Sequence, residues 1–137
     1  MAYRYLNANP KGLNVGDCVI RAISLATGIP WMYVHEELCD LSRTMYDMPS
    51  SNRVWKRYLE TLGFREHQME NTCPDCFTVD KFTRLNPYGI YILSTCEISK
   101  AQNIFVTGSH VVAVMEGDYY DTWDSGLDIP LSYFIIK

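Results

Sequence analysis

The spacing of apolar residues changes near the middle of this chain, and that change constrains the fold more than any other feature. Up to Gly63 the apolar side chains recur every three or four residues, which is the period of amphipathic helices. Beyond Gly63 they form short runs separated by turn residues, which is typical of strands. Helices followed by strands favour an α+β fold. We therefore expect N-terminal helices packed on a C-terminal antiparallel sheet.

The first half contains three segments with helix start and stop signals. The first segment follows Asp17, a favourable N-cap, and ends at Gly28, which suits a helix C-terminus. The second opens at Pro30, and the third follows the capping sequence Ser50-Ser51-Asn52. The three helices are therefore expected at residues 18–27, 30–43 and 52–62.

The second half is expected to form the sheet, with one short helix. The sequence Glu116-Gly117-Asp118 lies between two apolar runs and predicts a hairpin centred on Gly117. Asn86-Pro87 should end the short helix. Residues 96–107 are expected to form an irregular loop. The strands are expected at residues 64–69, 90–94, 110–115, 119–123 and 131–136, and the short helix at residues 78–85.

Length and composition favour a single globular domain over residues 1–137. The hydrophobic fraction is 47% and the charged fraction is 20%, both ordinary for a folded domain. The net charge is -4 and the basic residues are scattered, so we expect no nucleic-acid partner. The apolar runs are too short to span a membrane, and no signal peptide follows Met1. We therefore expect a cytoplasmic protein with no membrane partner.

Cys18 is the candidate nucleophile. The chain has five cysteines, and an odd number without a secretion signal argues against a disulfide framework. Cys18 is the first residue of the first expected helix, where the helix dipole favours the reactive thiolate. Cys39 lies late in a helix and Cys96 follows a strand, so neither has this placement. The alternative is that Cys18 is a small buried apolar residue, as most free cysteines are.

His110 is the candidate base for that thiol. It follows Gly108-Ser109 and opens an apolar strand, at an accessible end of the expected sheet. A general base must lie within hydrogen-bond reach of its nucleophile, and such an end allows it. We expect His35 on a solvated helix face and His67 in a structural role, so both are weaker candidates.

Two aspartates compete to orient the His110 ring. A hairpin centred on Gly117 sets Asp124 directly opposite His110, where cross-strand side chains touch. Asp121 is the alternative third residue, and it requires a different strand register. Asp124 also suits a surface position in an Asp-Ser-Gly turn, which would leave it without a catalytic role.

Hydrolysis at a thiol also needs donors for the oxyanion that forms on the attacked carbonyl. The backbone N–H of Cys18 lies at a helix start and is one candidate donor. The side-chain amide of Asn14 is a second candidate, four residues before the cysteine. Asn14 equally suits a turn, and the sequence leaves both roles open.

Four segments, spread in order over almost the whole chain, carry a resemblance to a known family. They are GDCVIRAI at residues 16–23, YLETLGF at residues 58–64, HVVAV at residues 110–114, and Asp124 with Gly126. In these segments the chain resembles the papain-like cysteine peptidases, above all the leader peptidases of bacteriocin exporters and related small proteins of bacteria and their phages. The resemblance implies a papain-like fold, with Cys18 as nucleophile, His110 as base and acid, and Asp124 as the orienting carboxylate.

The resemblance also implies the reaction: hydrolysis of a peptide or isopeptide bond in a peptide or protein substrate, without a cofactor. The chain departs from the family pattern at Asn14, because family members often carry a Gln before the cysteine. The segment Asp121-Thr122-Trp123 is similar to the Asn-Ser-Trp that carries the third residue in papain itself, which keeps Asp121 open as the alternative third residue. The segment around Cys18 is also similar to the nucleophile helix of ovarian-tumour-type deubiquitinases, which would change the substrate class and keep the mechanism.

Cys73-Pro74-Asp75-Cys76 supports a competing hypothesis. A Cys-x-x-Cys sequence supplies two of the four ligands of a structural zinc. His67 is a possible third ligand, and Cys39 or Cys96 would have to complete the set. The chain would then be a catalytically inactive papain-like binding or virion-associated module, with zinc at Cys73 and Cys76. The simplest alternative is a tight turn at Pro74 with two idle thiols.

Overall fold

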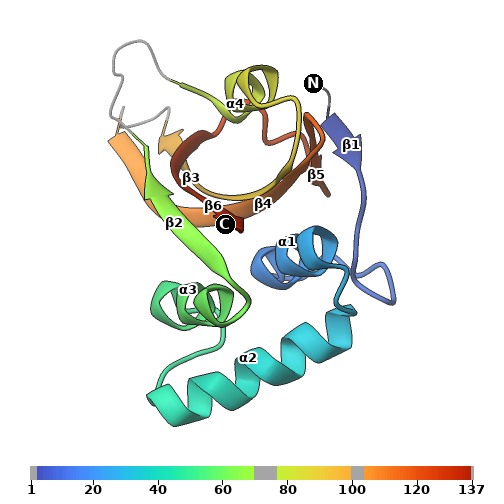
Figure 1. Cartoon of the computed structure of the whole chain (residues 1–137), viewed down its shortest axis with the longest axis vertical. Coiled ribbons are helices and arrows are strands. Elements are labelled where there is room, and N and C mark those ends of the chain that lie inside the picture. Colours follow the sequence, from blue (N-terminus) through green and yellow to red (C-terminus); the bar gives the residue numbers. More distant parts are fainter. Residues whose placement is uncertain (1–2, 70–76, 100–103, 137) are drawn as a thin grey trace.

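The computed structural model describes residues 3–69, 77–99 and 104–136. Helices dominate the first half and strands the second (Figure 1). None of the helices in the described ranges has the length and apolar character needed to cross a bilayer. The helices are α1 (Cys18–Thr27), α2 (Trp31–Met45), α3 (Asn52–Thr61) and α4 (Val79–Leu85). The strands are β1 (Tyr3–Tyr5), β2 (Phe64–Gln68), β3 (Ile90–Ser99), β4 (Ile104–Met115), β5 (Asp118–Asp121) and β6 (Ile129–Ile136).

The described strands form one mixed sheet in the order β1-β5-β4-β3-β6-β2. The sheet curls around α4 on its concave side, and α1, α2 and α3 lie beyond its other face (Figure 1). β1 pairs with β5 in parallel, with Tyr5 beside Asp121, and the other neighbours are antiparallel. The α+β class is confirmed. The expected all-antiparallel sheet is wrong, because Tyr3–Tyr5 near the N-terminus, where no strand was expected, adds a parallel edge strand.

Each face of the sheet carries its own apolar core. Val111 and Ala113 of β4 pack with α1 and its neighbouring helices, whereas Val112 and Val114 pack on the side of α4. Because successive side chains of a strand point to opposite faces, a strand covered on both sides is apolar at consecutive positions. This explains the unbroken Val-Val-Ala-Val run after His110, and it fixes β4 between the two layers.

The predicted loop over residues 96–107 is wrong in the described part of that segment. β3 continues to Ser99 and β4 begins at Ile104, so the antiparallel pair is longer than the apolar pattern indicated. Backbone pairing continues past a register shift between Thr95 and Glu97. Such a bulge breaks the two-residue alternation from which strands are recognised in a sequence, and this accounts for the error.

The hairpin between β4 and β5 has a tighter turn than expected. Glu116 and Gly117 have φ angles of 51° and 81°, and two successive positive φ angles make the turn that two-residue hairpins favour. Met115 therefore pairs with Asp118. The centre of the hairpin lies between Glu116 and Gly117, so the register predicted from a centre on Gly117 is wrong.

Candidate active site

Cys18 begins α1 and is half-buried against the helical core. Asp17 occupies the N-cap position as predicted, but its side chain makes no capping hydrogen bond. Its carboxylate instead accepts hydrogen bonds from Arg21 and from the indole N–H of Trp31, the latter at 3.0 Å. The first turn of α1 thus has no side-chain cap, and the partial positive charge of the helix start lies next to the thiol.

His110 is bound to a carboxylate in the interior. It lies in β4 opposite Thr95 of β3, and its Nε2 is 2.5 Å from Oδ2 of Asp121, the last residue of β5. His110 is 7% exposed and Asp121 is 3% exposed. A carboxylate in this position orients the imidazole ring and favours its protonated form. Of the two predicted candidates, Asp121 is the one that the fold brings to His110.

Donors on neighbouring segments hold Asp121 in place. Its Oδ2 also accepts a hydrogen bond from Ser125 Oγ at 2.8 Å, and its Oδ1 accepts one from the Thr122 N–H at 2.8 Å. A nitrogen of the Arg21 guanidinium lies 3.7 Å from Oδ1. The Asp121 carbonyl accepts the N–H of Leu6 at 3.0 Å, next to the β1–β5 pairing. Burying a carboxylate without such partners would be strongly unfavourable, so these contacts make the buried position possible.

Asp124, the other predicted candidate, is bound elsewhere. Its Oδ1 accepts a hydrogen bond from the Tyr119 hydroxyl at 2.6 Å and another from the Gly126 N–H at 3.0 Å. The carboxylate therefore braces the turn after β5, and the predicted His110–Asp124 pair is wrong.

The hairpin register explains this outcome. Extending the observed pairing sets Asp121 opposite Val112, two residues along β4 from His110. Diagonal neighbours of this kind remain within reach of a long or aromatic side chain. A centre on Gly117 would instead have set Asp124 opposite His110. Because the centre of the turn is displaced by half a residue, Asp121 and not Asp124 comes within reach of His110.

The surroundings of Cys18 favour its thiolate. Burial alone would raise the pKa of the thiol, but hydrogen bonding to His110 and the positive charge of its ring lower it. A backbone hydrogen bond from Val111 and the nearby Arg21 guanidinium lower it further. The net effect is a Cys18 pKa below its ordinary value, which is the condition for a reactive thiol at neutral pH.

The same contacts favour the imidazolium form of His110. Burial lowers the pKa of the ring, and the hydrogen bonds to Asp121 and Cys18, together with their negative charges, outweigh that effect. The pKa of His110 rises to about 9. A lowered thiol pKa beside a raised imidazole pKa describes a thiolate–imidazolium pair, with Asp121 behind the ring.

A cleft of about 330 Å³ opens beside this pair. Its lining includes Asn14, Gly16, Cys18, Arg21, His110 and Trp123. The Trp123 ring lies against the His110 ring, with centroids 4.9 Å apart, and Trp123 is 40% exposed. Asn14 thus lines the same cleft as Cys18, and its role as an oxyanion donor stays a prediction. The indole of Trp123 shields the outer side of the imidazole from water.

Arg21 was not predicted to belong to the site. It bonds to Asp17 at one end and approaches Asp121 at the other, and it is 7% exposed. The signal in the sequence was an arginine on the inward face of α1, beside the buried Val19 and Ala22. A buried charge on an apolar helix face requires partners, and here the partners are two aspartates of the site.

The remaining thiol and imidazole candidates lie apart from this cleft. His35 is exposed on α2, as predicted, and its Nδ1 is 3.9 Å from the Cys39 sulfur. His67 stacks on the Tyr133 ring, with centroids 5.0 Å apart. Cys73 and Cys76 lie outside the described residues, so the zinc hypothesis stays a prediction. Among the residues that are described, no three His, Cys, Asp or Glu side chains group as ligands of a metal ion.

Comparison of the chain with protein-family models, with curated proteins and with solved structures finds no match. The case for a function therefore depends on the geometry of the Cys18–His110–Asp121 group alone. A thiol, an imidazole and a carboxylate in this arrangement can supply a nucleophile, a base that also serves as an acid, and an orienting group, which is the set required for covalent acyl transfer.

Proposed function

We propose that the chain is a cysteine hydrolase that cleaves a peptide or isopeptide bond through an acyl-enzyme. One observation carries the proposal: the buried His110 ring is hydrogen-bonded to the Asp121 carboxylate and lines the same cleft as Cys18. A purely structural cysteine needs neither an imidazole partner nor a carboxylate behind that imidazole. The arrangement is the one expected of a papain-like enzyme, with Asp121 in the role first assigned to Asp124.

The proposed reaction begins with attack of the Cys18 thiolate on the acyl carbon of the scissile amide. The carbonyl oxygen takes the negative charge and accepts hydrogen bonds from the Cys18 N–H and the Asn14 side-chain amide. The His110 imidazolium then gives its proton to the leaving nitrogen as the carbon–nitrogen bond breaks. This leaves a thioester at Cys18 and a free amine.

Water completes the cycle. The neutral His110 ring takes a proton from a water molecule as the water oxygen attacks the thioester carbon. The carbon–sulfur bond breaks, the acid product leaves, and the thiolate–imidazolium pair is restored. Asp121 keeps the ring oriented through both steps and stabilises its positive charge.

Reaction with p-nitrophenyl acetate tests this proposal without a known substrate. Attack by the thiolate should release p-nitrophenolate and leave an acetyl group on Cys18, which mass spectrometry of peptide digests locates. Water should then release acetate, so that turnover continues after the first equivalent. We expect Cys18→Ala to remove both phases, with a loss of roughly 10³-fold or more in rate.

Cys39→Ala is the matched control, because Cys39 is also half-buried and also lies near an imidazole. This variant should retain the rate of the unmodified protein. Acetylation of Cys39 in place of Cys18, or an unchanged rate in Cys18→Ala, would contradict the proposal and favour a non-catalytic binding module.

A further inference from the structure

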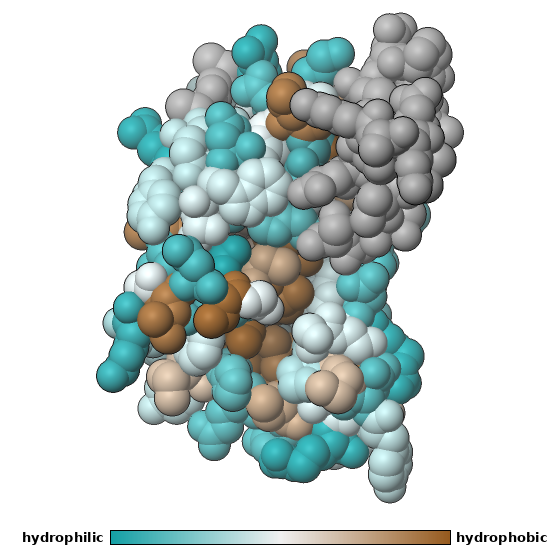
Figure 2. Space-filling view, turned by 180° about the vertical axis from the view of Figure 1, so that it is seen from behind, coloured by the Kyte–Doolittle hydropathy of each residue, from teal (hydrophilic) through white to brown (hydrophobic). Residues whose placement is uncertain are grey.

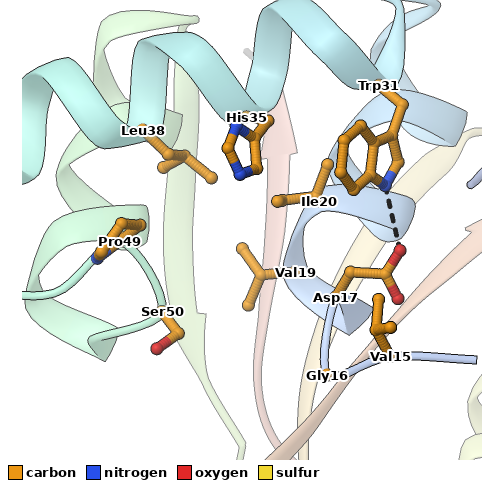
Figure 3. Close-up of a pocket in the computed structure, with 10 residues that line it drawn as sticks. All are labelled: Val15, Gly16, Asp17, Val19, Ile20, Trp31, His35, Leu38, Pro49 and Ser50. Carbon is orange, nitrogen blue, oxygen red and sulfur yellow. Dashed lines mark hydrogen bonds between the residues drawn. The ribbon is translucent and has the colours of Figure 1, made fainter.

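A second hollow, of about 290 Å³, lies between α1 and the N-terminal part of α2 (Figure 3). Residues 49 and 50, which precede α3, close its far side. Its wall is formed mostly by apolar side chains, including Val15, Val19, Ile20, Trp31, Leu38 and Pro49. Figure 2 shows apolar side chains gathered around a hollow on the helical half of the molecule. We call this hollow the apolar pocket.

The apolar pocket adjoins the proposed active site. Val15 and Gly16 line both the apolar pocket and the cleft that contains Cys18 and His110. The turn before the nucleophile therefore has the reactive thiol on one side and the apolar wall on the other. A chain bound with its scissile carbonyl at Cys18 has a neighbouring side chain within reach of this wall.

A hydrogen bond joins the wall of the apolar pocket to the residue before Cys18. The indole N–H of Trp31 donates to the Asp17 carboxylate at 3.0 Å, and Asp17 directly precedes Cys18 (Figure 3). On its other side the Trp31 ring stacks on His35, with centroids 5.2 Å apart and planes inclined by 16°. A side chain that contacts Trp31 would thus be held at a fixed position relative to the sulfur, and such preorganisation favours binding.

The chemistry of the lining selects against charge. Only Asp17 and His35 among the lining side chains can ionise. The Asp17 carboxylate is already bound to Arg21, Asn9 and Trp31. The His35 ring lies flat against the indole. A charged side chain entering the apolar pocket would lose its hydration without gaining a good ionic partner.

We infer that the apolar pocket is a specificity site that accepts one large, uncharged side chain of the substrate, such as Leu, Met or Phe. This inference deepens the proposed hydrolase function and rests on it. The volume of about 290 Å³ is just below the range of small-ligand pockets, about 300–1,000 Å³, so the hollow suits a single side chain.

Peptidyl vinyl sulfones provide the test. The Cys18 sulfur adds to the terminal vinyl carbon, and the adjacent carbon takes up a proton, so inactivation needs no other reagent. The probes are acetylated tripeptides in which one position is Leu, Ala, Asp or Lys and the other two are Gly. We expect Leu at one position to react roughly 10- to 100-fold faster than Ala, Asp or Lys there. Dividing each rate by that for iodoacetamide with the same protein corrects for changes in thiol reactivity.

Ile20→Trp should fill the apolar pocket and bring the ratio of the Leu and Ala rates close to one. Leu25→Trp is the matched control, because Leu25 is another partly buried side chain of α1 that does not line the apolar pocket. It should keep the preference of the unmodified protein. The comparison of probes on the unmodified protein does not depend on the folding of either variant.

The outcomes separate the two proposals. Preferential alkylation of Cys18 by iodoacetamide without any preference for Leu would overturn the specificity site and leave the hydrolase standing. A preference for Asp or Lys would also overturn it. Absence of reaction at Cys18 with every reagent would overturn both. Loss of the Leu preference in Ile20→Trp, with retention in Leu25→Trp, is the result that supports the inference.

Discussion

Two thiol–imidazole pairs in this molecule differ in their surroundings. Cys18 and His110 come from different elements, a helix start and a strand, and a buried carboxylate lies behind the ring. Cys39 and His35 lie four residues apart on one helix, where His35 is exposed and stacks on Trp31. Proximity of sulfur and imidazole is common to both pairs, so proximity alone does not define a site.

The difference lies in what surrounds each imidazole. Asp121 holds the proton on the His110 ring, and low exposure strengthens that interaction relative to one in water. The start of α1 adds a favourable field at Cys18, whereas Cys39 lies well inside its helix. Three features therefore distinguish the Cys18–His110 pair: a carboxylate, burial and a helix terminus. The carboxylate can be removed by itself.

Removing the carboxylate should have the largest effect. Asp121→Asn leaves the shape of the site nearly unchanged but withdraws the charge behind His110. We expect the rate of Cys18 acylation by p-nitrophenyl acetate to fall by about 10²-fold or more. The measurement is the burst rate of p-nitrophenolate release, at a temperature where circular dichroism shows the variant folded. That condition is needed because breaking a buried ion pair can cost about 3–5 kcal/mol.

Asp124→Asn is the matched variant, three residues away. It weakens the hydrogen bond from the Tyr119 hydroxyl and should lower the free energy of unfolding by about 1 kcal/mol. Its burst rate should stay close to that of the unmodified protein. The opposite result, a slow Asp124→Asn and a fast Asp121→Asn, would return the third role to Asp124.

The rates of alkylation at Cys18 and Cys39 should differ by a smaller factor than the acylation rates above. At pH 7 an ordinary thiol is only a few per cent ionised, so a lowered pKa at Cys18 should make it react with iodoacetamide roughly tenfold faster than Cys39. Peptide mapping after timed quenching gives the rate at each cysteine. His110→Ala should remove the advantage of Cys18, and His35→Ala should leave Cys39 unchanged. Equal rates in the unmodified protein would remove the distinction between the pairs.

The smallest expected effect is a shift in the pH at which His110 titrates. Its pKa of about 9 lies above the ordinary 6.5, so the folded protein binds this proton more tightly than the unfolded chain does. The stability contributed by the imidazolium is therefore complete below pH 6.5 and is lost as the pH rises through about 9. The proton NMR signals of the ring should titrate near pH 9, and Asp121→Asn should move the midpoint to lower pH. A midpoint at the ordinary value in the unmodified protein would contradict this assignment.

The three helices of the first half could be predicted because local signals specify them. Gly28 adopts a φ of 77° where α1 ends, a conformation that glycine accommodates without strain. β1 could not be predicted in this way. Its three residues, Tyr-Arg-Tyr, are too few to show a period, and the strand depends on pairing with β5 more than a hundred residues later.

The site was predictable to the extent that its residues lie next to local signals in the sequence. Cys18 begins a helix and His110 follows a Gly-Ser pair before an apolar run, and both placements are visible in the sequence. The choice between Asp121 and Asp124 depended on whether the turn is centred on Gly117 or half a residue before it. Glu116 decides this by adopting a positive φ, which is uncommon for a residue other than glycine.

The distance along the sequence between Cys18 and His110 sets the order in which the proposed site can assemble. Cys18 begins α1, whereas His110 and Asp121 lie on β4 and β5, near the other end of the element order. During synthesis α1 can form long before β5 leaves the ribosome. Until then Cys18 has no charged imidazole beside it and behaves as an ordinary cysteine. Under the proposed function, this order of assembly would keep a nascent chain from premature acylation.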